Sequence, residues 1–267
     1  MLKDITLGQY FPGNTVVHRL DPRTKLIAVV LYIVAIFLSP GWVSSGLMVA
    51  VLALCVGVSR IPPKALFKGL KPLLFIVILT GFLNLFYTDG RVLVEWWIFR
   101  ITHEGVKRAI LMVLRIMLLV SGTFLLTYTT SPLAITDGLE QLFNPFKKLG
   151  LPVHELSMMM SIALRFIPTL LEETDKIMSA QKARGADFET GSLLQRAKAL
   201  LPVLVPLFVS AFRRADELAT AMECRCYRGG EGRTRLKELH MHGIDVLALC
   251  FFALVLAAAI ALRMYGL

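Results

Sequence analysis

Five apolar blocks with few or no charges dominate the pattern of hydrophobic and polar positions. They lie at about residues 26–38, 42–58, 72–87, 109–128 and 244–262. A membrane-spanning helix needs about 20 predominantly apolar residues, with a lower limit near 17. The first and third blocks are short, but their flanks can extend them because a lysine such as Lys25 can snorkel towards water. The pattern therefore predicts an all-α integral membrane protein with about five transmembrane helices.

The stretch 131–242 has a different pattern and predicts helices outside the membrane. Ser131-Pro132 is expected to open a short helix that reaches about Lys148. From 153 to 184 and from 193 to 222, apolar residues recur at spacings of three and four, which indicates two long amphipathic helices. We expect these two helices to cross each other. We expect Gly185 and the pair Gly229-Gly230 to end these helices, and Pro168, Pro202 and Pro206 to kink them.

Charges argue against placing these two helices in lipid. The first contains Arg165, Glu172, Glu173 and Asp175, and each charge costs at least about 2.5 kcal/mol at the centre of a bilayer. A seven-span arrangement is the main alternative, because residues 200–212 are apolar enough to resemble a span. The expected division is a domain of four spans at 1–130, cytoplasmic or interfacial coupling helices at 131–242, and a last span at 243–267.

The loop charges predict the orientation in the membrane. The loop 60–71 has four Lys or Arg residues and no acid, whereas the loop 88–105 has both signs. The positive-inside rule then places the N-terminus, the loop 60–71 and residues 131–243 in the cytoplasm. Trp96 and Trp97 fit either an outer aromatic belt or ordinary loop aromatics. The net charge of +10 follows from the same rule, so we expect no nucleic-acid partner.

Signals for catalysis are missing from the sequence. There is no G-x-x-x-x-G-K-S/T phosphate-binding loop, so the chain is not expected to bind or hydrolyse ATP or to hold a cofactor. We expect no metal at Cys224-x-Cys226 or at His240-x-His242, because each motif has only two ligands. Arg115 lies in an apolar block, where either a paired role or snorkelling to the outer interface is possible. Without a series of acidic residues across the membrane, a transport path in this chain alone is poorly supported.

Two arginines end the two long helices in matching surroundings. Arg184 lies between Ala183 and Gly185, and Arg225 lies between Cys224 and Cys226. An alanine precedes each arginine by four residues, and the two arginines are 41 positions apart. Ordinary surface arginines at helix ends are the simpler interpretation. The small neighbours favour docking instead, because they leave the planar guanidinium uncrowded for bidentate pairing with a partner.

These motifs resemble the T component (EcfT) of energy-coupling factor transporters, which are ABC-type importers of vitamins and metal ions. The resemblance covers nearly the whole chain. The opening signature is similar at Leu20, Asp21, Pro22, Arg23 and Lys25. The signatures of the two long helices are similar at the residues Arg165, Pro168, Ala183, Arg184, Gly185, Arg214, Asp216, Glu223 and Arg225. Cys224 and Cys226 stand where the family often has alanine or glycine, which makes the second tip a candidate for oxidation.

The resemblance implies a division of labour in the bacterial cell membrane. Two ABC ATPase subunits, as a homodimer or heterodimer, bind ATP with magnesium, and a separate S component captures the substrate. The T component connects them, with Arg184 and Arg225 docked in grooves of the ATPases. The alternatives are an autonomous carrier or channel, which flux through the chain alone would reveal, and a membrane enzyme, for which no group of acid, base or metal ligands is found.

Overall fold

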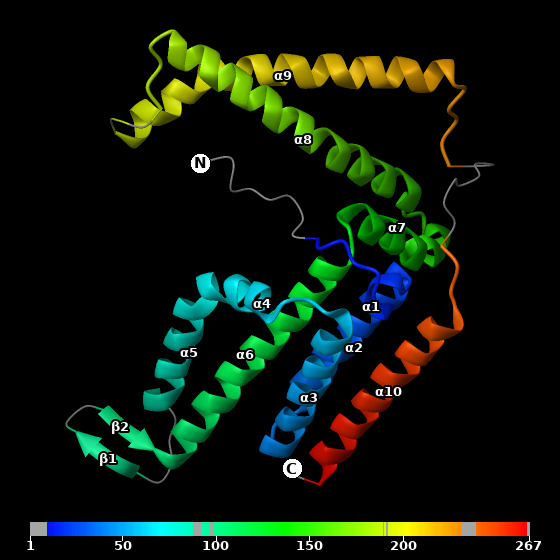
Figure 1. Ribbon diagram of the computed structural model, residues 1–267. Coiled ribbons are helices and arrows are strands. Elements are labelled where there is room, and N and C mark those ends of the chain that lie inside the picture. Colours follow the sequence, from blue (N-terminus) through cyan, green and yellow to red (C-terminus); the bar gives the residue numbers. More distant parts are fainter. Residues whose placement is uncertain are drawn as a thin grey trace. The chain divides into compact units, whose positions relative to one another are not determined.

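The computed structural model describes residues 10–87, 92–96, 99–188, 190, 192–230 and 239–265. The described residues fall into two compact units, and each is considered by itself. One unit is a helical bundle that contains α1 to α7, the strands β1 and β2, and α10 (Figure 1). The other contains a 3-10 helix and the long helices α8 and α9. The predicted all-α membrane fold is confirmed. The three-part division at 1–130, 131–242 and 243–267 stays a prediction.

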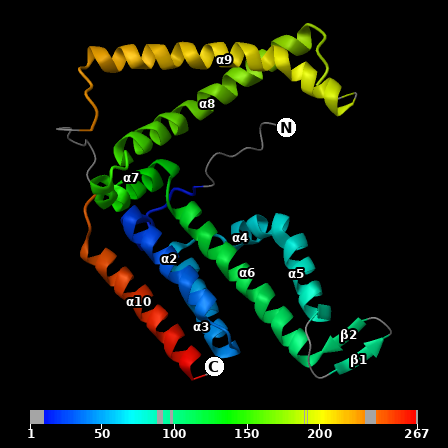
Figure 2. The same ribbon diagram turned by 180° about the vertical axis from the view of Figure 1, so that it is seen from behind.

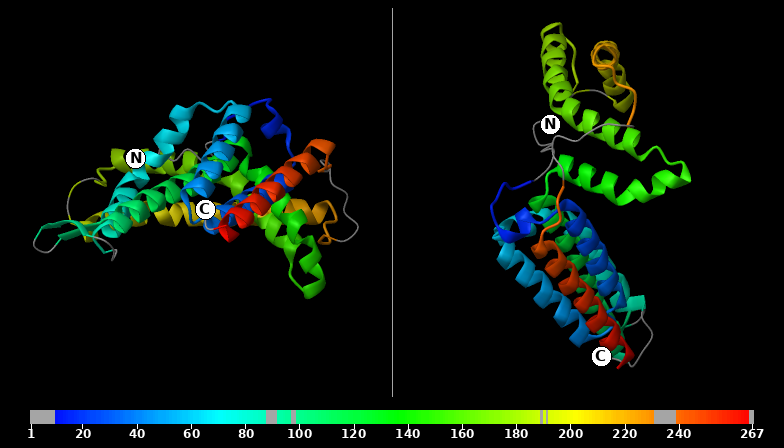
Figure 3. Two further views of the ribbon diagram at one scale, coloured as in Figure 1. Left: turned by 90° about the horizontal axis from the view of Figure 1, so that it is seen from below. Right: turned by 90° about the vertical axis from the view of Figure 1, so that its right-hand side faces the viewer.

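Four helices form the centre of the bundle. They are α2 (Pro22–Leu38), α3 (Trp42–Ser59), α6 (His103–Thr129) and α10 (Gly243–Met264). They lie side by side in the views of Figures 1 and 3. Their shared core consists of apolar residues from all four helices, namely Tyr32, Ala35, Ile36, Met48, Val51, Leu118, Val255 and Ala259. Small residues in this core allow close packing, which is the main attraction between helices in lipid.

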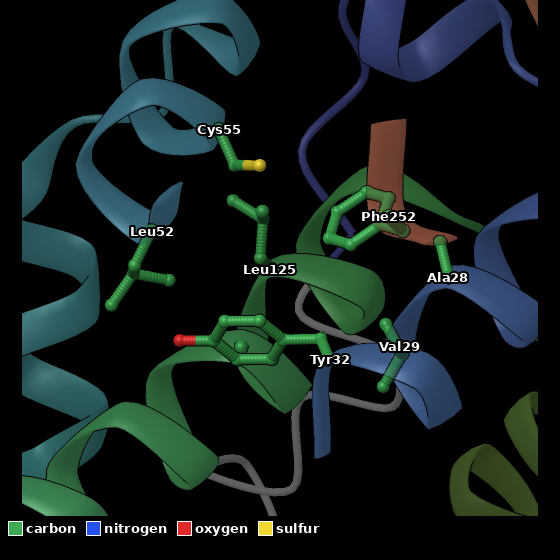
Figure 4. A pocket seen from close by; sticks show the side chains of 8 residues that line it. Ala28, Val29, Tyr32, Leu52, Cys55, Leu125 and Phe252 are labelled. Atoms are coloured by element: carbon green, nitrogen blue, oxygen red, sulfur yellow. The ribbon is translucent and has the colours of Figure 1, made fainter. Parts of the chain in front are cut away.

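The aromatic ring of Tyr32 fits against α6 because residue 122 is glycine. A Cβ atom at Gly122 would lie 2.5 Å from Cε1 of Tyr32. A cavity of about 30 Å³ lies beside this ring, and residues of all four central helices line it (Figure 4). Leu52 and Cys55 come from α3, and Phe252 comes from α10. The Tyr32 hydroxyl has no hydrogen-bond partner among the described residues.

The third predicted span is a bent segment and not one regular helix. It comprises α4 (Pro63–Leu70), a 3-10 turn at Lys71–Leu73, and α5 (Leu74–Tyr87). The bend falls at Lys71-Pro72 because proline lacks the N–H that a continuous helix needs. The last part, α5, packs beside α6, as Figure 2 shows from behind.

The remaining short elements of the bundle connect its helices. A hairpin of β1 (Val92–Trp96) and β2 (Phe99–Thr102) joins α5 to α6, where the sequence analysis assumes only a loop. Trp96 pairs with Phe99 in this hairpin, whereas Trp97 lies outside the described residues. The short helix α1 (Val16–Arg19) precedes α2. The helix expected to reach Lys148 ends earlier, because α7 (Pro132–Phe143) gives way to a 3-10 helix at Asn144–Leu149, which contains Pro145.

Five of the described helices are long and apolar enough to cross a membrane. They are the segments Trp42–Ser59, Pro63–Phe86, His103–Thr129, Leu194–Cys224 and Gly243–Met264. The number agrees with the prediction, but the membership differs. The helix α2 has 17 residues and is shorter than these five, although it lies at the centre of the bundle. The helix α9 is included, although it is the least apolar of the five.

Candidate functional site

The candidate site lies at the ends of α8 (Val153–Ala183) and α9 (Leu193–Cys224), which have 31 and 32 residues. The start of α9 is fixed by a capping box. The Ser192 hydroxyl accepts the Gln195 N–H at 3.4 Å, and the Gln195 side chain accepts the Ser192 N–H at 2.9 Å. These bonds satisfy N–H groups that the first helical turn leaves without partners. The helices begin where the sequence pattern predicts.

The C-terminal ends of the two helices have the same backbone geometry. At the end of α8, the Ala186 N–H donates to Gln181 O and the Gly185 N–H donates to Lys182 O. At the end of α9, the Tyr227 N–H donates to Met222 O and the Cys226 N–H donates to Glu223 O. Both sets are the paired hydrogen bonds of a Schellman motif. Arg184 and Arg225 therefore occupy the same position, the C-cap, at the ends of their helices.

The Schellman motif requires a left-handed residue directly after each arginine. Gly185 supplies it at φ +90° for α8, and Cys226 supplies it at φ +55° for α9. The first helix thus ends as predicted at Gly185, but the second does not continue to Gly229-Gly230. It ends at Cys224, because a non-glycine residue adopts the left-handed conformation there. This early end places Arg225 at the tip and not inside a longer helix.

The two tip arginines are exposed to solvent, as are their small neighbours Ala183, Gly185, Cys224 and Cys226. A cation at a helix C-terminus is favoured by the helix dipole. An exposed guanidinium with small neighbours can present its fork of N–H donors to carboxylates or carbonyl oxygens of another protein. Each helix end can therefore act as a point of attachment.

A polar contact joins the two helices away from their tips. The Arg214 guanidinium donates to a Glu173 carboxylate oxygen at 2.9 Å. A hydrogen bond from Ser210, followed by the charge and hydrogen bond of Arg214, lowers the pKa of Glu173 below its ordinary value. The carboxylate of one helix is thus held by a guanidinium of the other. Arg214 belongs to the predicted signature, whereas Glu173 and Ser210 do not.

The opening signature lies in the bundle, where it forms a buried polar network. Asp21 caps the start of α2, accepts the Arg23 N–H at 2.9 Å and forms an ion pair with the Arg23 guanidinium at 2.9 Å. Burial raises the pKa of Asp21, but the hydrogen bonds and charge of Arg23 lower it by more, so the pKa lies below its ordinary value. Arg23 also donates to Leu239 O at 2.8 Å, just before α10.

The last helix joins this network through Asp245, which is 1% exposed. Its two carboxylate oxygens accept the backbone N–H groups of Asp21 and His242, each at 2.8 Å. Lys25 is also buried and donates to the carbonyl oxygens of His18 and Thr129 at 3.2 and 3.0 Å. The expectation that Lys25 snorkels to water is therefore wrong. Both Lys25 and Asp245 join the ends of separate helices.

The other signature residues have simpler positions. Leu20 ends α1, and Pro22 begins α2 next to Gly138 of α7. Pro168 lies inside α8, and Arg165 and Asp216 are exposed on α8 and α9. Glu223 contributes its carbonyl oxygen to the end of α9. The signature residues thus lie in two places: some at helix ends in the bundle, and the others on the long helices α8 and α9.

The open question of Arg115 has a structural answer. Its guanidinium donates to Ser39 O at 2.9 Å, at the C-terminal end of α2. A carbonyl at a helix end has no partner within its own helix, so an arginine from α6 satisfies it. Within the described part of the chain, no group of three or more metal-ligating side chains is found, and this includes the surroundings of His240 and Cys224.

Comparison with known proteins decides the family. A family model described as cobalt transport protein (CbiQ) matches residues 13–236. The chain is 54% identical over 247 residues to an energy-coupling factor transporter transmembrane protein EcfT of Ruminiclostridium cellulolyticum, with 92% of each chain covered. It is 50% identical to an EcfT of Clostridium kluyveri over the whole of both chains. The chain belongs to the EcfT family.

Relatives from other bacteria cover the chain equally well. An EcfT of Bacillus subtilis is 48% identical over 98% of this chain and 100% of its own length. The names describe these relatives as transmembrane proteins of energy-coupling factor transporters. The predicted family and its transport and membrane character are therefore confirmed.

Sequence reasoning missed the residues of this EcfT-family chain that act only through tertiary contacts. Glu173 and Arg214 are separated by 41 residues, as are Arg184 and Arg225. This shared spacing was a signal for the ion pair, because Glu173 precedes Arg184 by the same number of residues as Arg214 precedes Arg225. No comparable signal marks Asp245, whose partner Asp21 lies 224 residues away.

Proposed function

We propose that the chain is the coupling subunit of an energy-coupling factor importer in the bacterial cell membrane. Two ABC ATPase subunits hold ATP and magnesium, and a substrate-binding S component captures a vitamin or a metal ion. The chain itself is not an enzyme. It passes the movement of the ATPases to the S component through α8 and α9, which lie on the cytoplasmic side together with the N-terminus.

The matching ends of α8 and α9 are the main support for this function. An ATPase dimer presents two equivalent surfaces, and a subunit that connects to both needs two equivalent points of attachment. The two Schellman motifs supply such points, each with an exposed arginine at the same position. The sequence has no phosphate-binding loop, which agrees with hydrolysis by other subunits.

The charges of α9 support its place outside the lipid, although it is apolar enough to span. Its second half contains Arg213, Arg214, Asp216 and Glu217, all before the tip at Arg225. In a spanning helix these side chains would enter the hydrocarbon or its interface, at a cost of about 2.5 kcal/mol or more each near the centre. An interfacial position leaves the charged side in water and the apolar side against lipid or a partner.

The docking role is tested by reversing the charge at each tip. We expect Arg184→Glu and Arg225→Glu each to lower the amount of ATPase that co-purifies with the chain by at least about tenfold, because bidentate pairing of an exposed arginine becomes repulsion. The amount of chain in the membrane should stay the same, since both side chains are exposed. Quantitative immunoblotting of membranes and of the purified complex measures both quantities.

Arg213→Glu is the matched control, because Arg213 is an exposed arginine on α9 that lies twelve residues before Arg225 and beside the contact of α9 with the middle of α8, away from both tips. It should retain the ATPases at the level of the unmodified chain. Normal co-purification with both tip variants would show that the tips are not the docking points. Equal loss in the tip variants and the control would indicate a general effect of charge.

A further inference from the structure

Glu173 of α8 and Arg214 of α9 form an ion pair, called the clamp below, at the same sequence distance from each tip. Glu173 precedes Arg184 by eleven residues, and Arg214 precedes Arg225 by the same number. Eleven residues of α-helix correspond to roughly 16 Å. The clamp is therefore separated from each docking arginine by the same length of helix.

Little of α9 is buried by the rest of the described chain. Among the described residues of α9, Val203 alone is buried. Large apolar side chains of α9, such as Phe208 and Phe212, are more than half exposed. Polar contacts with defined geometry therefore contribute to how the two helices are aligned.

A second polar contact lies at the tip of α8. The Gln181 side-chain amide donates to Pro202 O at 3.5 Å, a long hydrogen bond. That carbonyl has no donor in its own helix, because the residue four positions later is Pro206, which lacks an N–H. Gln181 precedes Arg184 by three residues. The tip of α8 is thus attached to the proline-containing part of α9, where Figure 1 shows that helix bend.

The order of these contacts shows that the helices run in opposite directions. Gln181 follows Glu173 along α8, while Pro202 precedes Arg214 along α9. The two tips therefore point away from each other on either side of the clamp. A displacement of one tip rotates its helix about the clamp and moves the other helix only if the clamp holds.

We propose that Glu173 and Arg214 are positioning residues that make the two docking tips move as one unit. This inference rests on the proposed coupling function. Without the clamp, each ATPase subunit displaces its own helix independently, and ATP hydrolysis continues with little effect on the S component. The clamp thus determines how much substrate is imported for each ATP hydrolysed, rather than whether the complex assembles.

The test measures uptake and hydrolysis in parallel in proteoliposomes that contain the full complex. Glu173→Gln and Arg214→Gln should lower the substrate imported per ATP by at least about fivefold while ATPase binding is retained. The charge-reversed pair, Glu173→Arg with Arg214→Glu, should recover most of the ratio. The matched controls are Glu172→Gln and Arg213→Gln, which alter exposed neighbours on the same two helices and should leave the ratio unchanged.

Two results would overturn the inference. One is an unchanged ratio in both single variants. The other is a charge-reversed pair that is no better than the single variants. Failure of the proposed function looks different, because the unmodified chain would then neither bind ATPases nor support uptake, and no variant could differ from it.

A measurement on the full chain in lipid nanodiscs tests the clamp without any partner. Spin labels at Ala180→Cys and Ala221→Cys, each four residues before a tip, report the distance between α8 and α9 in a background with serine at the four native cysteines. We expect one narrow distance distribution that broadens in Glu173→Gln and stays narrow in Glu172→Gln. An equally narrow distribution in Glu173→Gln would contradict the clamp, even if that variant fails to assemble with ATPases.

Discussion

At the scale of single residues, the two helix ends differ in how they reach the left-handed conformation. Gly185 adopts it without a side chain, whereas Cys226 adopts it at φ +55°. For a residue with a Cβ atom this conformation costs roughly 1–2 kcal/mol. The same hydrogen-bonding pattern thus has different local stabilities at the two tips, and the second tip is the weaker one.

Exchanging the residue types tests this difference. Cys226→Gly should stabilise the end of α9 by about 1 kcal/mol, and Gly185→Ala should destabilise the end of α8 by a similar amount. No atom lies within 4 Å of a Cβ at Gly185, so the cost there is conformational only. Hydrogen exchange should show about fivefold more protection of the Tyr227 amide and about fivefold less of the Ala186 amide. Equal protection in both variants would contradict the assignment of strain to Cys226.

The predictability of single residues depended on whether their partners were local. The position of Arg184 at a helix end could be predicted because its stop, Gly185, is visible in the sequence, whereas the stop at Cys226 after Arg225 was not. Lys25 was placed wrongly because its acceptors at His18 and Thr129 come from other segments. A buried lysine with two carbonyl partners cannot be told from a snorkelling one by hydropathy alone.

At the scale of elements, the bundle depends on polar contacts between helix ends. Asp245 of α10 accepts the N–H groups of Asp21 and His242, and all three groups lie where helices begin. A buried N–H without an acceptor costs about 1–3 kcal/mol. Asp245 therefore attaches the last helix to the first long one, α2, although 224 residues separate the two partners.

Removal of this carboxylate should loosen the bundle. Asp245→Ala leaves two N–H groups without their acceptor, and we expect a loss of on the order of 3 kcal/mol in the free energy of unfolding. Asp245→Asn keeps one acceptor oxygen and should lose about half as much. Thermal unfolding of the purified chain in detergent shows which variant is the less stable, and Glu217→Ala, at an exposed position, is the control. If all three variants unfold at the same temperature, Asp245 does not hold the helices together.

The close contact between α2 and α6 gives a second prediction at this scale. Gly122→Ala brings a methyl group within 2.5 Å of the buried Tyr32 ring, and such overpacking costs about 1–3 kcal/mol. Gly57→Ala in α3 is the control, because no atom lies within 4 Å of a Cβ there. The first substitution should lower the thermal midpoint, and the second should leave it unchanged or raise it. A lower midpoint for Gly57→Ala alone would contradict the close packing of Tyr32 against Gly122.

Element boundaries were predictable where the chemistry is local. The starts of α8 and α9 and the end of α8 follow from the periodicity and from Gly185. The end of α9 was placed five residues too late at Gly229-Gly230, because no sequence rule selects a cysteine for a left-handed position. Hydropathy and length also could not show which of α2 and α9 belongs to the bundle. The helix α2 is short but lies in the bundle core, whereas α9 is long and combines an apolar face with charges.

At the scale of the whole molecule, the chain combines a helical bundle with a pair of long helices that have matching ends. The bundle is held by small residues in its core and by the Asp21, Arg23 and Asp245 network. The long helices contact each other through the Glu173 clamp and bear the exposed arginines. The proposed coupling function requires both parts, because the bundle anchors the chain in the membrane and the long helices present the two arginines to partners.

The most direct test measures ATP hydrolysis and substrate uptake together in proteoliposomes, first with this chain alone and then with its ATPase and S-component partners. We predict neither activity for the chain alone and both activities for the complete complex. Uptake should disappear when Arg184 and Arg225 are both replaced by glutamate. Hydrolysis or substrate flux by the chain alone, or full uptake by the doubly substituted complex, would contradict the coupling function.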